Sequence, residues 1–243
     1  MKFIPYLSTL ITFFFAVAVF NRYRQRGGWH LLLWGIGLVF YGLGTLSEVL
    51  LSLTFNPFIL KLWYLTGAML TAAWLGMGTV HLLVRKGNTA KILTWVLAAI
   101  SLLAFILVMF APVNSAAYNV TQPASVQYKD ILTRNGGTIL LTILLNIYGT
   151  LTLVGGAIYS AFLFWRKKVL ASRMFGNILI AAGALSPAMG GTFLKAGFTD
   201  FLYLSEFLGA ILMYVGFVLA TSGKTEEASY SPVLPAQPRT GGD

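Results

Sequence analysis

The stretch from Trp29 to Leu53 decides the fold, and it reads WHLLLWGIGLVFYGLGTLSEVLLSL. A helix crosses the hydrocarbon core of a bilayer with about 20 mostly apolar residues. This stretch exceeds that length and carries a single acidic residue, Glu48. It therefore predicts a transmembrane helix.

Six similar stretches lie along the rest of the chain. With this one included, the expected spans cover about 3–20, 29–53, 57–84, 91–111, 138–164, 174–195 and 201–222. Composition agrees, because 57% of the 243 residues are hydrophobic and 10% are charged, against about 25% charged residues in soluble domains. We therefore expect an all-α integral membrane protein. We expect a seven-transmembrane-helix bundle over 1–222, and we expect a Pro-, Gly- and Ser-rich cytoplasmic tail over 223–243 to be disordered.

Lys and Arg are concentrated in the connections after the first, third and fifth spans and in the tail. The positive-inside rule places these segments in the cytoplasm, so the N-terminus is expected outside and the C-terminus inside (N-out/C-in). We expect a multi-pass protein of the bacterial cytoplasmic membrane. Because the basic residues flank the spans, the net charge of +10 indicates contact with membrane lipids rather than with nucleic acid.

The second and third spans align with the sixth and seventh without a gap. Gly44-Thr45-Leu46-Ser47 matches Gly183-Ala184-Leu185-Ser186, and Tyr64 matches Tyr203 at the same offset. The first span then pairs with the fifth, and the fourth is an unpaired linker. This pattern predicts a parallel 3+1+3 repeat about an axis along the membrane normal. Chance similarity between apolar segments is the alternative.

Acidic residues inside the hydrocarbon region are costly, and they indicate a functional role by default. Glu48 and Glu206 are both expected near the outer ends of their spans. One interpretation is an outward-opening polar pocket that binds a cation, a proton or an amine. The other is a pair of structural carboxylates that form ion pairs with Lys61 or Lys195.

Four more residues complete the candidate set of ligand or ion-pair residues. Tyr41 shares a helical face with Glu48, and Tyr64 and Tyr203 are the tyrosines that the repeat matches. Pro187 removes a backbone hydrogen bond in the middle of its span. The kink that it predicts is either a hinge, a part of a binding site or an ordinary bend of a membrane helix.

Two histidines, His30 and His81, are expected at similar depth near the cytoplasmic face. A pair of this kind can ligate a haem or a chlorophyll-type pigment, although histidines at a membrane boundary need no such role. The chain contains no Cys, and it shows no metal-ligand or catalytic motif. We therefore expect no metal site, no enzyme activity and, unless these histidines ligate a pigment, no cofactor.

The sequence resembles the seven-transmembrane sensor region at the N-terminus of many bacterial histidine kinases. The resemblance lies mainly in residues 22–86 and rests on the basic run Arg22–Arg26, Gly44-Thr45-Leu46-Ser47-Glu48-Val49-Leu50, Lys61-Leu62-Trp63-Tyr64-Leu65-Thr66-Gly67, His81 and Arg85-Lys86. It implies the sensing of an external or membrane-level signal. The printed chain carries no kinase or other output domain, so the signal is expected to leave through a membrane-protein partner.

Three functions fit these observations. The first is a sensor-like or receptor-like membrane module that acts through a partner protein. The second is an accessory or scaffold subunit of a larger membrane complex, with or without a bound pigment. The third is a small-solute or proton-coupled transporter that uses Glu48, Glu206 and the break at Pro187.

Overall fold

The computed structural model of the chain describes residues 3–84, 87–166, 171–195 and 199–222. It consists of helices, and the described residues contain no strand, only an isolated bridge between Val113 and Leu132. The helices are α1 (Ile4–Arg26), α2 (Trp29–Leu53), α3 (Pro57–Trp63), η1 (Tyr64–Leu70), α4 (Thr71–Leu83), α5 (Thr89–Met109), η2 (Ser115–Ala117), α6 (Ala124–Ile131), α7 (Gly136–Arg166), α8 (Ala171–Lys195) and α9 (Thr199–Ser222).

Six helical stretches of the described chain are long and apolar enough to cross a membrane. They are Ile4–Arg26, Trp29–Leu53, Pro57–Leu83, Thr89–Met109, Gly136–Arg166 and Phe201–Thr221. The chain is therefore an all-α, multi-pass membrane protein, as its composition predicts. The expected span at 174–195 corresponds to α8, which is not among these six, so its crossing stays a prediction. The expected tail at 223–243 lies outside the described residues.

Local sequence explains where several helices begin and end. α1 continues through the basic run to Arg26, further than the expected end at residue 20, and stops at Gly27 and Gly28, whose φ values are 64° and 103°. Glycine adopts such angles without a steric penalty. At the start of α3, Asn56 accepts hydrogen bonds from the backbone N–H groups of Phe58 and Ile59, which is the usual role of an N-cap.

The third span is not a uniform α-helix. Residues Tyr64–Leu70 form the π-helical turn η1 between α3 and α4. The Thr66 carbonyl accepts two hydrogen bonds from Thr71, one from its backbone N–H and one from its hydroxyl at 2.7 Å. Short π-helical segments inside α-helices are frequent at functional sites.

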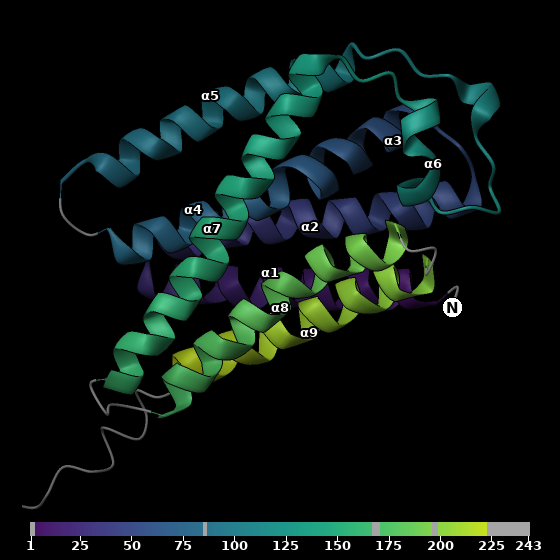
Figure 1. Ribbon diagram of the computed structural model, residues 1–243. Coiled ribbons are helices and arrows are strands. Elements are labelled where there is room, and N and C mark those ends of the chain that lie inside the picture. Colours follow the sequence, from purple (N-terminus) through teal and green to yellow (C-terminus); the bar gives the residue numbers. More distant parts are fainter. Residues whose placement is uncertain (1–2, 85–86, 167–170, 196–198, 223–243) are drawn as a thin grey trace, which may run out of the picture.

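The helices run between two ends of an elongated bundle (Figure 1). The N-terminus, the α2–α3 connection and α6 lie at one end, here called the N-terminal end. α4 packs between α2 and α7, α8 packs along α9, and α1 packs on α2 and α9, whereas α5 lies at the edge of the bundle. α7 crosses its neighbours obliquely (Figure 1), and a Cβ on its Gly149 would collide with the Ala72 backbone of α4.

Two large apolar clusters form most of the core of the described chain. The first joins α2 and the helices from α3 to α7 around buried residues such as Leu60, Met69 and Ile131. The second joins α1, α2, α4, α7 and α9 around residues such as Val19 and Phe217. A small third cluster joins α7 and α8. The candidate site described next is lined by residues from both large clusters.

Candidate functional site

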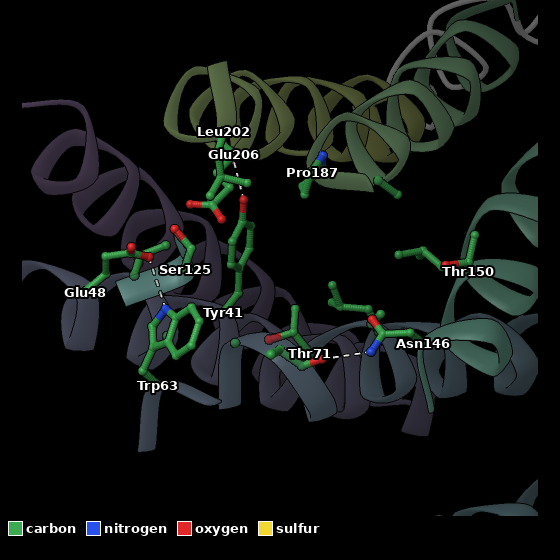
Figure 2. Close-up of a pocket in the computed structure, with 18 of the residues that line it drawn as sticks. Tyr41, Glu48, Trp63, Thr71, Ser125, Asn146, Thr150, Pro187, Leu202 and Glu206 are labelled. Carbon is green, nitrogen blue, oxygen red and sulfur yellow. Dashed lines mark hydrogen bonds between the residues drawn. The ribbon is translucent and has the colours of Figure 1, made fainter. Parts of the chain in front are cut away.

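A cavity of about 330 Å³ lies between α2, α3, η1, α4, α7, α8 and α9, and α6 borders it with Ser125 and Tyr128 (Figure 2). Its lining residues are Tyr41, Gly44, Thr45, Glu48, Trp63, Gly67, Ala68, Thr71, Ala72, Leu75, Ser125, Tyr128, Asn146, Thr150, Leu153, Ala184, Pro187, Leu202, Glu206 and Met213. Ligand-binding cavities in proteins usually have volumes of roughly 300–1,000 Å³. The volume of this cavity lies at the lower end of that range, and its lining is partly polar and partly apolar.

Glu48 lies in the wall of this cavity, on the fifth residue before the end of α2. It is only 5% exposed. Its Oε2 atom accepts a hydrogen bond from the Trp63 indole N–H at 3.0 Å, and its Oε1 atom accepts one from the Tyr203 hydroxyl at 2.8 Å. Both carboxylate oxygens are thus held by neutral donors from α3 and α9.

No described Lys, Arg or His neutralises Glu48. Lys61 instead donates from its Nζ atom to the Met109 carbonyl at 2.7 Å, so the expected ion pair between Lys61 and Glu48 is not formed. The side chain of Lys195, the other expected partner, lies outside the described residues. Within the described chain, the acidic group is therefore fixed by hydrogen bonds alone.

Glu206 of α9 faces the same cavity. Its backbone carbonyl accepts a hydrogen bond from the Tyr41 hydroxyl at 2.8 Å, whereas its carboxylate accepts none from the described residues. Figure 2 shows that carboxylate on the side of the cavity where Ser125 and Glu48 lie. The two carboxyl groups are close enough to interact electrostatically.

Ser125 of α6 adds a polar group beside both acids. It is 9% exposed, and its hydroxyl is buried without a hydrogen-bond partner among the described residues. The hydroxyl lies next to the Glu48 carboxylate and the Tyr203 hydroxyl but does not meet the geometry of a hydrogen bond with either. A buried polar group that is left unsatisfied costs roughly 1–3 kcal/mol, so this hydroxyl calls for an explanation.

The segment that carries α6 is fastened over the cavity by hydrogen bonds. The Gln127 side chain bonds to the backbone of Asn119 and Gln122 at 2.8 Å. The Tyr118 hydroxyl donates to the Leu51 carbonyl at the end of α2 at 2.7 Å. Burial raises the pKa of Tyr118, and the nearby Glu48 carboxylate raises it further, so this hydroxyl stays a neutral donor at physiological pH.

Aromatic rings line the cavity near the acids. Tyr128 of α6 stacks at a tilt on Trp63, with ring centroids 5.5 Å apart. Arg134 lies outside the cavity, with its guanidinium 4.8 Å from the centroid of the Tyr128 ring. Burial raises the pKa of Tyr128, and the Arg134 charge partly opposes this effect.

The far side of the cavity has a second polar group. Asn146 of α7 donates from Nδ2 to the carbonyls of Ala68 and Thr142, both at 2.8 Å. Figure 2 shows Asn146 and Thr150 across the cavity from Glu48. Small and apolar side chains, among them Ala68 and Leu153, also line the cavity.

The structure brings five of the six candidate residues together. Tyr41, Glu48, Pro187 and Glu206 line the cavity, and the hydroxyl of Tyr203 binds Glu48. The sixth candidate is Tyr64, whose hydroxyl shares a hydrogen bond with Thr142 at 2.9 Å and whose side chain does not line the cavity.

The two histidines lie elsewhere. His81 Nε2 shares a hydrogen bond of 2.7 Å with the Thr94 hydroxyl, and its ring stacks on Trp29 at 6.0 Å. His30 packs edge-on against Trp34 at 5.6 Å. Neither histidine lines the cavity, and the nitrogen that most often binds a haem iron is occupied in His81.

Sequence reasoning missed seven polar or aromatic residues of the site, three of them the threonines Thr45, Thr71 and Thr150. Trp63 and Tyr128 carried no signal of their own, and Ser125 lies in a short helix that no apolar run announces. Asn146 did carry a signal, because an amide in the middle of an apolar span is unusual.

The chain matches no protein family model, no curated protein and no solved structure.

Proposed function

We propose that the chain is a sensor-like membrane module that binds a small ligand in this cavity and acts through a partner protein. In this proposal α8 also crosses the membrane, as the sixth of seven spans. The N-terminal end of the bundle faces outside, so that the ligand arrives from outside a bacterial cytoplasmic membrane. The positive-inside pattern and the resemblance of residues 22–86 to histidine kinase sensor regions support this placement.

One observation carries the proposal: two carboxyl groups and an unpartnered hydroxyl face one cavity, with no described cation to neutralise them. Burying a charge is costly unless it is paired, and an apolar side chain at position 48 or 206 would pack without that cost. A ligand that completes these contacts accounts for the retained polar groups.

In this proposal, the helices that line the cavity transmit the effect of ligand binding to the opposite end of the bundle. α2 and α9 each place a carboxylate in the cavity and continue for most of the bundle length. A change in the separation of Glu48 and Glu206 on ligand binding shifts these helices relative to each other. A partner protein bound at the opposite end would respond to that shift, as the sensor proposal requires.

A transporter is the second candidate, and a specific observation favours it. The π-helical turn η1 and Pro187 of α8 flank the same cavity. Interrupted helices at membrane depth usually line a cavity or a transport path. Uptake of a solute into liposomes that contain the purified chain alone would favour this candidate over the sensor.

Filling the cavity tests the proposed function before any ligand is known. Ala184 lines the cavity on α8, and Ala182 is exposed on the same helix. Cells of the native host that express wild type, Ala184→Phe or Ala182→Phe are compared with a deletion strain by transcript profiling. We expect Ala184→Phe to reproduce the deletion profile at normal protein level, whereas Ala182→Phe behaves as wild type.

The other functions give different outcomes. An accessory or scaffold subunit predicts that Ala184→Phe behaves as wild type and that only the deletion disturbs a membrane complex on native gels. That result would overturn the sensor proposal. Loss of accumulation of one solute in Ala184→Phe cells, with uptake by the purified chain in liposomes, would replace the sensor with the transporter.

A further inference from the structure

We infer that the ligand of the cavity is a small organic amine, bound as its ammonium ion between Glu48 and Glu206. This inference rests on the proposed function, since it names the class of ligand for the same site. It follows from the charge, the donor and acceptor balance, the aromatic wall and the size of the cavity.

Charge and hydrogen-bonding capacity point to a cationic donor. An ionised carboxylate offers about four acceptor sites. Side-chain hydrogen bonds use one on each oxygen of Glu48, and the Ser125 backbone N–H also approaches this carboxylate, whereas the described residues donate none to Glu206. The Ser125 hydroxyl between them also lacks a partner. A protonated amine supplies several N–H donors and a positive charge at one point, which matches this set.

A metal ion fits the site less well. Calcium takes six to eight oxygen ligands in a compact sphere, and the described residues contain no group of three or more His, Asp or Glu side chains that could hold a metal. The cavity is also far larger than an ion. A water occupies about 30 Å³ of liquid, so 330 Å³ has room for a molecule of roughly ten non-hydrogen atoms.

Aromatic rings favour an ammonium head over other polar groups. Tyr41 and Trp63 line the cavity on the side of the acids, and Tyr128, another lining residue, packs on Trp63. Cations are attracted to the faces of such rings. A quaternary ammonium would satisfy the rings but leave the acceptors without donors. The carboxylates and Ser125 therefore favour an amine that carries N–H groups.

The side of the cavity opposite the acids indicates which groups the ligand carries besides its ammonium group. The wall also contains apolar side chains such as Ala68 and Leu153, and Asn146 and Thr150 lie across the cavity from Glu48. The Asn146 carbonyl oxygen accepts no hydrogen bond from the described residues, since both described contacts of this amide come from Nδ2. An amine with a short apolar chain and a terminal hydroxyl would place its ammonium group at the acids, its chain against the apolar side chains and its hydroxyl near Asn146.

Direct binding to the purified full-length chain tests this inference. The probes are ω-amino alcohols of four to eight carbons, among them 6-amino-1-hexanol. The matched controls are 1,6-hexanediol, which is neutral, 6-hydroxyhexanoate, which is anionic, and the N-trimethylated amino alcohol. Calorimetry in detergent or nanodiscs gives Kd. We expect at least one amino alcohol to bind at least tenfold more tightly than its three controls.

Variants then assign the binding to the two acids. We expect Glu48→Gln and Glu206→Gln each to weaken binding about tenfold or more, because each removes a charge-assisted hydrogen bond. Asp130→Asn removes a carboxylate from an exposed position on α6 and should leave Kd unchanged. Ser125→Ala should fold, because the Ser125 hydroxyl makes no hydrogen bond with the described residues. It should also weaken binding, because it removes a ligand contact, so it keeps the inference testable if Glu48→Gln fails to fold.

The failures are distinguishable. Equal binding of 6-amino-1-hexanol and 1,6-hexanediol, tighter binding of the anion, or no binding of any amino alcohol up to millimolar concentration would overturn the amine assignment. Tighter binding of sodium or potassium than of every amine would also overturn it. In each case the sensor proposal stands if Ala184→Phe still reproduces the deletion profile, and it fails only if that variant behaves as wild type.

Discussion

At the scale of single residues, the two donors that hold Glu48 determine what its loss does to stability. Glutamine at position 48 has one oxygen, so either Trp63 or Tyr203 loses its acceptor inside the bundle. An unsatisfied buried donor costs roughly 1–3 kcal/mol. We expect Glu48→Gln to lower the free energy of unfolding by that amount, measured by chemical unfolding in mixed micelles.

The matched control for this prediction is Asp130→Asn. Asp130 is an exposed carboxylate on α6, and surface substitutions usually stay within about ±0.5 kcal/mol. A Glu48→Gln variant as stable as the control would show that the hydrogen bonds to Trp63 and Tyr203 contribute little.

Ser125 gives the opposite expectation. Its buried hydroxyl has no described partner, so Ser125→Ala removes a polar group without breaking a hydrogen bond. In the absence of ligand we expect the free energy of unfolding to stay the same or to rise by about 1 kcal/mol, in the same assay. A fall of more than about 1 kcal/mol in the free energy of unfolding would mean that the hydroxyl holds α6 in place. The reason for treating this hydroxyl as a ligand contact would then disappear.

The sequence identifies the acids of the site but not their partners. Glu48 and Glu206 stand out because a carboxylate in an apolar span is rare, and the helical wheel adds Tyr41. Proximity to the same boundary suggested Lys61 as the partner of Glu48, but Lys61 binds the end of α5 instead. Which donor reaches a buried carboxylate depends on how three separate helices pack, and a pattern along one helix does not contain that information.

At the scale of the elements, helix existence follows from the sequence better than helix detail. Apolar runs predict the spans at 29–53 and 57–84 closely, because only a helix satisfies its own backbone hydrogen bonds in lipid. The continuation of α1 to Arg26 was missed, since basic residues do not end a helix and only Gly27 does. The turn η1 was missed as well, because a π-helical turn has no residue pattern of its own.

The π-helical turn yields an element-scale prediction. The Thr71 hydroxyl donates to the Thr66 carbonyl, and Thr71 also lines the cavity. Thr71→Val keeps the shape but removes this hydrogen bond. We expect it to lower the free energy of unfolding by roughly 0.5–1.5 kcal/mol and to weaken the binding of any ligand in the cavity. Thr54→Val, at an exposed position after α2, is the control and should change neither quantity.

The aligned segments of the expected repeat share one structural feature. A Cβ on Gly44 would lie 2.7 Å from Gly67 Cα, and a Cβ on Gly183 would lie 2.7 Å from the Gly209 carbonyl oxygen. Each matched glycine thus marks a close approach to the next span. The parallel 3+1+3 repeat itself stays a prediction.

At the scale of the whole molecule, orientation and the number of crossings can be measured together. The chain contains no Cys, so one introduced thiol reports one position. We expect an impermeant thiol reagent to label Thr121→Cys in intact cells and to leave Gly87→Cys unlabelled until the membrane is opened. Labelling of Gly87→Cys alone would reverse the proposed orientation.

The same assay tests the crossing of α8. α7 ends at Arg166, and α9 begins at Thr199. If α8 crosses the membrane between them, Thr199→Cys is labelled from outside and Arg166→Cys is not. Identical labelling of the two positions would leave six spans and would place α8 on one side of the membrane.

The most direct test of the central claim measures whether the cavity admits small cations in preference to anions. Ala184→Cys places a thiol in its wall, and Ala117→Cys places one at an exposed position of η2, outside the spans. Reaction rates with a cationic aminoethyl and an anionic sulfonatoethyl methanethiosulfonate are compared, each relative to the rate at Thr121→Cys. The account predicts a relative preference for the cation of about tenfold or more at Ala184→Cys, since the acidic groups in the cavity wall attract it, and no such preference at Ala117→Cys. Equal relative rates at both positions, or a preference of Ala184→Cys for the anion, would contradict the account.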